Sequence, residues 1–145
     1  MMHAVLYAAF QALALWLLWT GQKSDTKTQW LKVGVLLLLV FAGTVGISVL
    51  LKWMAQSLAL FTVATAKQYA IAVSMSLLCL WGMAMLIALI NVIGTSIKRF
   101  HETYNADNWK KVAPAVGGAQ PGVMIVARCL LSFASALMLS GLWLG

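Results

Sequence analysis

The chain has 145 residues, of which 63% are hydrophobic and only 9% are charged. Soluble domains carry about 25% charged and about 45–50% apolar residues. This composition excludes an ordinary water-soluble domain, because the chain has too few polar groups to cover a surface that faces water. Lipid or a large subunit interface must cover it instead, and the length indicates a single domain.

The charge is strongly basic, with ten Lys and Arg residues against three acids, which gives a net charge of +7. Such an excess suits anionic lipid or nucleic acid. In so apolar a chain the membrane interpretation is favoured, because basic loops beside apolar helices fix the orientation of membrane proteins. Cys79 and Cys129 lie inside apolar runs without metal or redox spacing, so we expect them to be small packing residues at helix interfaces.

The pattern of apolar runs predicts an all-α integral membrane protein whose long helices assemble side by side with other copies. We expect four helices and two basic loops: helices at about 3–20, 30–65, 68–103 and 122–144, and loops at 21–32 and 98–121. No basic residue precedes the first run, so we expect a retained helix and not a cleaved signal peptide. Its length of about 20 residues matches the hydrocarbon core of a bilayer.

The second run is longer than a bilayer requires. Nineteen uncharged residues separate Lys32 from Lys52, and the apolar pattern then continues to Lys67. A helix over 30–66 would be about 54 Å long, whereas the hydrocarbon core is about 30 Å thick. The helix must therefore bend near Lys52, project from the bilayer, or belong to a protein that is not in an ordinary bilayer.

Counting the basic residues predicts the orientation. Both expected basic loops are separated by two spans, so they share one side, which the positive-inside rule makes cytoplasmic. The turn between the second and third helices carries only Lys67. We therefore expect that turn and both chain ends on the opposite side.

The second basic loop combines cations with aromatic side chains. Lys98, Arg99, Lys110 and Lys111 are interleaved with Phe100, Tyr104 and Trp109. This mixture suits a phospholipid headgroup layer, a single strand of nucleic acid, or an ordinary cytoplasmic loop with interfacial anchors. Lys52 and Lys67 are further candidates for lipid-headgroup or lumen-facing cations, because each interrupts an apolar run.

Small residues recur along the helices and let helix backbones approach each other in lipid. The candidates for such packing are Gly43, Gly46, Gly82 and Gly141. Packing within one chain and packing between copies explain this pattern equally well.

The sequence offers no pattern of catalytic chemistry. His3 and His101 have no carboxylate at ligand spacing, and Glu102 and Asp107 lie in a polar segment outside the apolar runs. No phosphate-binding glycine loop is present, and no acid interrupts an apolar run to mark an ion path. We expect a protein that is not an enzyme and that needs no metal or cofactor, with phospholipid as a structural partner.

The order of elements in the last third of the chain resembles a known family. An apolar helix (LWGMAMLIALINVIGTSI) leads into a basic, His-containing segment (KRFHETYNADN), a proline-containing stretch (APAVGGAQPG) and a closing apolar helix (VMIVARCLLSFASALMLSGLWLG). This order is similar to that of the small polytopic membrane subunits of IncI-type conjugation and Dot/Icm (type IVB secretion) systems, the TraQ/TraR and IcmC/IcmD group.

The resemblance implies a structural subunit of a conjugative or type IV secretion apparatus, and first of all a pilin that forms a helical pilus with phospholipid for DNA transfer. Its implied partners are further copies, phospholipid and other secretion-system subunits, with DNA only as passing cargo. The implied location is the bacterial inner membrane, and the outside of the cell once a pilus is assembled. Two alternatives stay open: a fixed inner-membrane scaffold or channel subunit of the same apparatus, and a small holin-like pore.

Overall fold

The computed structural model describes the backbone of residues 2–20 and 26–145, and their side chains except at positions 26, 112 and 115–121. These residues form four helices and no strand, which confirms the predicted all-α class. In chain order the helices are α1 (Met2–Trp19), α2 (Thr26–Ser57), α3 (Val63–Tyr104) and α4 (Ala106–Trp143). Each contains a stretch that is long and apolar enough to cross a membrane.

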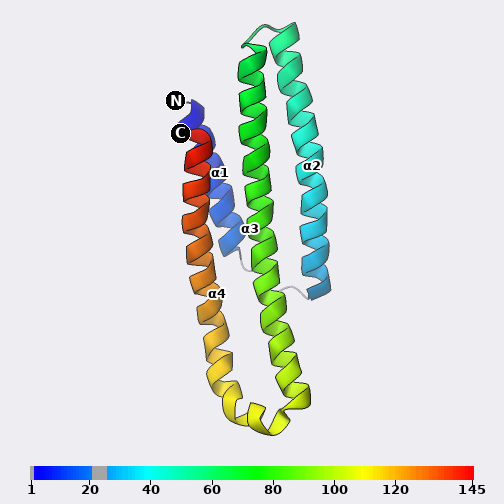
Figure 1. Ribbon diagram of the computed structural model, residues 1–145, viewed down its shortest axis with the longest axis vertical. Coiled ribbons are helices and arrows are strands. Elements are labelled where there is room, and N and C mark those ends of the chain that lie inside the picture. Colours follow the sequence, from blue (N-terminus) through cyan, green and yellow to red (C-terminus); the bar gives the residue numbers. More distant parts are fainter. Residues whose placement is uncertain (1, 21–25) are drawn as a thin grey trace.

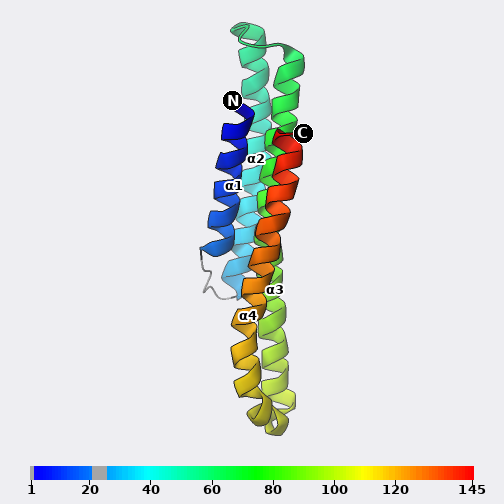
Figure 2. The same ribbon diagram turned by 90° about the vertical axis from the view of Figure 1, so that its left-hand side faces the viewer.

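The helices run up and down around α3, which is the longest. Figure 1 shows α2 on one side of α3 and α1 with α4 on the other, and Figure 2 shows the same bundle from the side. Within the described residues, α2 contacts α3 but neither α1 nor α4, whereas α1, α3 and α4 contact one another. The start of α1 and the end of α4 lie on the side of the bundle that carries the α2–α3 turn, as alternation of four helices requires, and the turn projects beyond them (Figure 1).

Lengths within the bundle are unequal. The 18 residues of α1 span about 27 Å, and the 42 residues of α3 span about 63 Å. Contacts between helices fix how α1 and α2 are aligned along α3. His3 of α1 meets Tyr69 of α3, and the indole of Trp81 on α3 donates to the carbonyl of Val33 on α2. The α3–α4 pair therefore continues well beyond the ends of α1 and α2, toward the lower end of Figure 1.

The turn between α2 and α3 lies earlier than expected. It occupies residues 58–62, so Lys67 belongs to α3 and not to the turn. No proline or glycine marks this turn. Instead Ala59 adopts the left-handed φ of 50°, and the hydroxyl of Thr62 accepts a bond from the backbone N–H of Thr65 and so caps α3.

The predicted loop at 98–121 is wrong. The chain is helical to Tyr104, turns at Asn105, and is helical again from Ala106 through Pro114 and Pro121. Proline fixes φ near the helical value, and helices in membranes tolerate the lost hydrogen bond when neighbouring groups compensate. The predicted final span is nevertheless confirmed, since the apolar part of α4 is Gly122–Trp143. Of the other predicted loop, 26–32 belongs to α2, and 21–25 lies outside the described residues.

The core lies where α1, α3 and α4 meet. Its buried members are Ala14, Leu18, Cys79, Leu80, Met83 and Ile87. Cys79 thus packs as expected, but Cys129 is exposed on α4 and does not. Much of the remaining apolar surface faces outward, which is the surface of a protein that lipid or other subunits surround.

Candidate functional site

The structure divides the predicted cations between two ends of the molecule. Lys52 and Lys67 lie near the α2–α3 turn, whereas Lys98, Arg99, Lys110 and Lys111 flank the α3–α4 turn. Figure 1 places these turns at opposite ends of the bundle. The predicted residues therefore form two separate clusters: the two-lysine groove, which Lys52 and Lys67 line, and the basic tip, which comprises residues 98–111.

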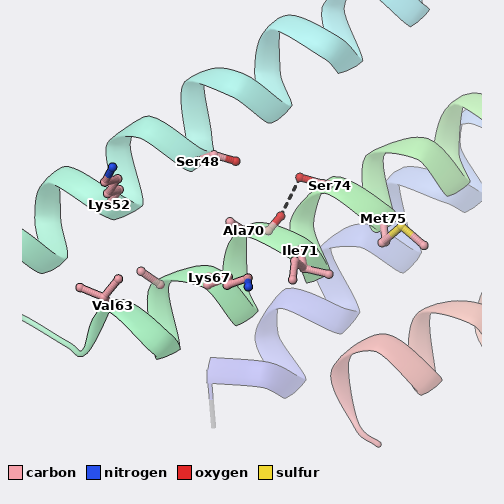
Figure 3. Close-up of a pocket in the computed structure, with 9 residues that line it drawn as sticks. Ser48, Lys52, Val63, Lys67, Ala70, Ile71, Ser74 and Met75 are labelled. Carbon is pink, nitrogen blue, oxygen red and sulfur yellow. Dashed lines mark hydrogen bonds between the residues drawn. The ribbon is translucent and has the colours of Figure 1, made fainter.

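The two-lysine groove opens between α2 and α3 and has a volume of about 510 Å³. Figure 3 shows Lys52 on α2 and Lys67 on α3, on opposite sides of the space between the helices. Apolar side chains of α3 form much of the remaining lining, namely Val63, Ala66, Ile71 and Met75. The sequence singled out both lysines, but not that they share one groove.

The charges in this groove are uncompensated. Neither Lys52 nor Lys67, both exposed, forms an ion pair with any described residue. The two acids that the structure describes, Glu102 and Asp107, lie at the other end of α3 and beside the α3–α4 turn. Two lysine side chains therefore border an apolar groove without a counter-charge among the described residues.

Two serine hydroxyls also line the groove, but their hydrogens are already used. Ser48 donates to the carbonyl of Thr44 at 2.7 Å, and Ser74 donates to the carbonyl of Ala70 at 2.6 Å. These bonds satisfy the hydroxyls inside their own helices. The lysine ammonium groups are thus the free donors that the described lining offers to an anion.

The basic tip is organised by its aromatic side chains. The rings of His101 and Trp109 stack across the α3–α4 turn, with centroids 6.0 Å apart and planes 8° apart, and Phe100 contacts Tyr104 with centroids 5.2 Å apart. Lys98 lies 3.8 Å from Glu102, but both side chains are about half exposed, so this pair contributes little stability. Trp109 thus helps to hold the turn, while Phe100 and Tyr104 remain exposed.

The four predicted glycines differ in whether a neighbouring helix lies close to them. A Cβ on Gly43 would lie 3.7 Å from Leu77 of α3, so Gly43 is at a helix interface. A Cβ on Gly46, Gly82 or Gly141 would meet no described atom within 4 Å. Packing within the chain therefore accounts for one of the four predicted glycines, and the other three are open to a neighbour.

Polar bridges between helices were missed by the sequence reasoning. Gln11 of α1 donates to Ser135 of α4 at 3.0 Å, and the indole of Trp19 donates to Ser132 at 3.2 Å. Isolated Ser and Gln residues inside apolar runs are the signal that could have identified them, because such residues bridge helices in membranes.

Among the described residues, no group of three His, Cys, Asp or Glu side chains could hold a metal ion. No family model, curated protein or solved structure matches the chain. The functional interpretation therefore depends on the geometry of the chain and on the resemblance stated above.

Proposed function

We propose that the chain is a structural subunit of a conjugative or type IV secretion apparatus, and that it acts as a pilin whose copies pack side by side with phospholipid into a helical wall. The observation that carries this proposal is the mismatch between the lengths of its helices. A bilayer core is about 30 Å thick. This thickness matches the length of α1 but is only about half the length of α3.

The surplus length of α3 and α4 contains the basic tip, but the helices beside the tip also expose apolar side chains. Ile93, Ile97 and Phe100 on α3, and Val123 and Ile125 on α4, are each at least half exposed. Exposing apolar surface to water costs about 25 cal/mol per Å². Neighbouring copies in a protein wall would cover these side chains along the whole length of α3, which a single bilayer cannot do.

The open glycines support contact between copies. Gly46 on α2 and Gly141 on α4 have free space where a side chain would begin, and small residues let a second helix approach closely in lipid. Because α2 contacts only α3 within the described part of the chain, its remaining faces are free to meet other subunits.

The basic tip fits the same proposal. In a tube of such subunits its cations would lie near lipid phosphates or the lumen, and DNA would pass as cargo without a sequence-specific contact. Other subunits of the apparatus would hold the chain in the inner membrane before assembly.

The test is electron microscopy of filaments sheared from producing cells, with mass spectrometry of their protein and lipid. Filaments built of this chain and phospholipid are the expected result. If the filaments lack the chain and it stays in the inner membrane, it is a fixed scaffold or channel subunit. Lysis on overexpression without any filament would point to a holin-like pore.

A further inference from the structure

The two shorter spans locate the bilayer on the bundle. The 18 residues of α1 span about 27 Å, and the nineteen uncharged residues between Lys32 and Lys52 on α2 span about 28 Å. Both lengths match a hydrocarbon core about 30 Å thick. Trp19 at the end of α1 and Lys32 near the start of α2 mark one boundary with water, where indoles and long cationic side chains are favoured.

The longest helix continues well past this boundary. The indole of Trp81 donates to the carbonyl of Val33, the neighbour of Lys32, so α3 crosses the boundary near Trp81. From Trp81 to Ile93 the helix rises about 18 Å, whereas the headgroup layer is only about 5–8 Å thick. Ile93 and the residues after it therefore lie outside the bilayer, in the part of α3 that extends below α1 and α2 in Figure 1.

Four large apolar side chains form an exposed stripe on this projecting part of α3. Ile93, Ile97, Phe100 and Tyr104 follow one another at intervals of four, three and four residues, so they lie on one face of the helix. Their side chains are 50%, 52%, 58% and 77% exposed. Apolar side chains that face lipid need no partner, but a contiguous apolar row in water marks an interaction surface.

The charges of the basic tip determine which partner fits the exposed stripe. Residues 98–111 carry four cations and two acids, so the surroundings of the stripe are net positive. Lys98 and Arg99 lie on opposite flanks, each about 100° around the helix from its neighbour in the stripe. The pair of Lys98 with Glu102, at 3.8 Å and half exposed, is weak enough to exchange. A helix with one apolar face and flanking carboxylates would cover the stripe and meet both cations.

Two other partners fit this surface less well. Copies of the chain in one bilayer lie at the same depth, so each stripe would meet an equally positive tip, and like charges oppose that contact. A single strand of nucleic acid could stack on Phe100 and Tyr104, but the aliphatic side chains of Ile93 and Ile97 offer its bases no aromatic surface.

We propose that the exposed stripe of α3 docks an acidic amphipathic helix of a cytoplasmic partner protein while the chain is in the bilayer. The cytoplasmic side is the side that the positive-inside rule gives to the basic tip. This docking goes beyond the proposed function, because it applies equally to a pilin before assembly and to a fixed membrane subunit. In a pilus, neighbouring copies would take the place of the partner helix.

The first measurement is the labelling of cysteine variants by a membrane-impermeant maleimide in inverted membrane vesicles. All variants carry Cys129→Ser, because Cys129 is exposed, whereas Cys79 is buried. Ile97→Cys should react at least tenfold faster than Leu38→Cys, which lies in the middle of the α2 span and is 69% exposed in the chain alone. Equal protection of the two cysteines would place the stripe in lipid and overturn the proposal.

The second measurement is peptide binding to the full chain in phosphatidylcholine nanodiscs, with empty nanodiscs as the background. The probe is a fluorescent designed helix with leucines on one face and glutamates on its flanks. It should bind at least tenfold more tightly than the same peptide with lysines in place of glutamates. Ile97→Ser with Phe100→Ser should abolish this binding. The matched control, Val123→Ser with Ile125→Ser, removes exposed apolar side chains from α4 near the same tip and should bind as the unmodified chain does.

Circular dichroism establishes that both double variants are as helical as the unmodified chain. Equal affinity for the two peptides, equal losses in the two double variants, or tighter binding of a single-stranded oligonucleotide than of the acidic peptide would each overturn the proposal. Cross-linking of Ile97→Cys between two copies in one nanodisc would assign the stripe to a second copy instead. Filaments without the chain would end the pilin proposal and leave the docking surface intact, whereas failed peptide binding would leave the pilin proposal standing.

Discussion

The indole N–H of Trp143 donates a buried hydrogen bond of 2.9 Å to the hydroxyl of Ser76 and so ties the last turn of α4 to α3. The same indole stacks on Phe10 of α1, with ring centroids 5.8 Å apart and planes 15° apart. Ser76 in turn donates to the carbonyl of Ala72. Trp143 of α4 therefore contacts both other helices that share the core, α3 through Ser76 and α1 through Phe10.

Replacing Ser76 with Ala should destabilise the protein by about 1–3 kcal/mol, because the buried indole N–H would lose its acceptor. The matched control is Ser74→Ala, two residues away on the same helix, whose hydroxyl bonds only within α3. The measurement is thermal or denaturant unfolding in detergent. Equal stabilities of the two variants would contradict a role for the Trp143 contact.

The pairing of Gln11 with Ser135 should show up as a coupling energy between α1 and α4. The amide donates to Ser135, and that hydroxyl, which is fully buried, also lies 3.3 Å from the amide oxygen. We expect Gln11→Leu and Ser135→Ala to be coupled by about 0.6 kcal/mol in a double-mutant cycle, the average for such bonds in membranes, and by about 1.7 kcal/mol at most. Strictly additive effects of the two changes would show that the side chains do not interact.

Leu18 and Leu13 provide a test of where the core lies. Both belong to α1, but Leu18 is 1% exposed and Leu13 is 47% exposed. Leu18→Ala should cost about 2–5 kcal/mol of unfolding free energy, because it leaves a cavity between α1, α3 and α4. Leu13→Ala should cost much less in the same detergent unfolding assay. A larger loss at Leu13 would mean that α1 turns its other face to the bundle.

The long apolar runs were sufficient to predict the helices, because in lipid only helices satisfy the backbone of such segments. The turns were harder. The sequence at 58–62 contains no proline or glycine and reads as a continuing helix, whereas Pro114 and Pro121 read as a loop although the helix continues through them. The α2–α3 turn depends on a left-handed Ala59 and on the N-cap Thr62, which are weaker sequence signals than proline or glycine.

The candidate site was predictable only in part. Isolated lysines in apolar runs identified Lys52 and Lys67, but their sharing of one groove depends on how α2 and α3 are aligned. Contacts far along the chain fix that alignment, such as the bond of 3.1 Å from the indole of Trp81 to the carbonyl of Val33. No periodicity within either helix contains this information.

Substitutions at Gly43 and Gly46 should distinguish an effect on folding from an effect on assembly. They lie three residues apart on α2, yet a Cβ on Gly43 would lie 3.7 Å from Leu77 while a Cβ on Gly46 would meet no described atom. Gly43→Leu should therefore overpack the α2–α3 interface and cost about 1–3 kcal/mol in detergent unfolding. Gly46→Leu should leave the stability of the single chain unchanged or slightly raised, since leucine favours the helix more than glycine does.

In cells, assembly and not stability should be the property that Gly46→Leu changes. If copies approach one another at the open face of α2, Gly46→Leu keeps the chain in the membrane but reduces cross-linking between copies and the yield of filaments. The matched substitution Gly46→Ala, which adds only one carbon, should reduce both far less. Undiminished cross-linking with Gly46→Leu would remove this face of α2 from the assembly and leave the open Gly141 face of α4 to be tested in the same way.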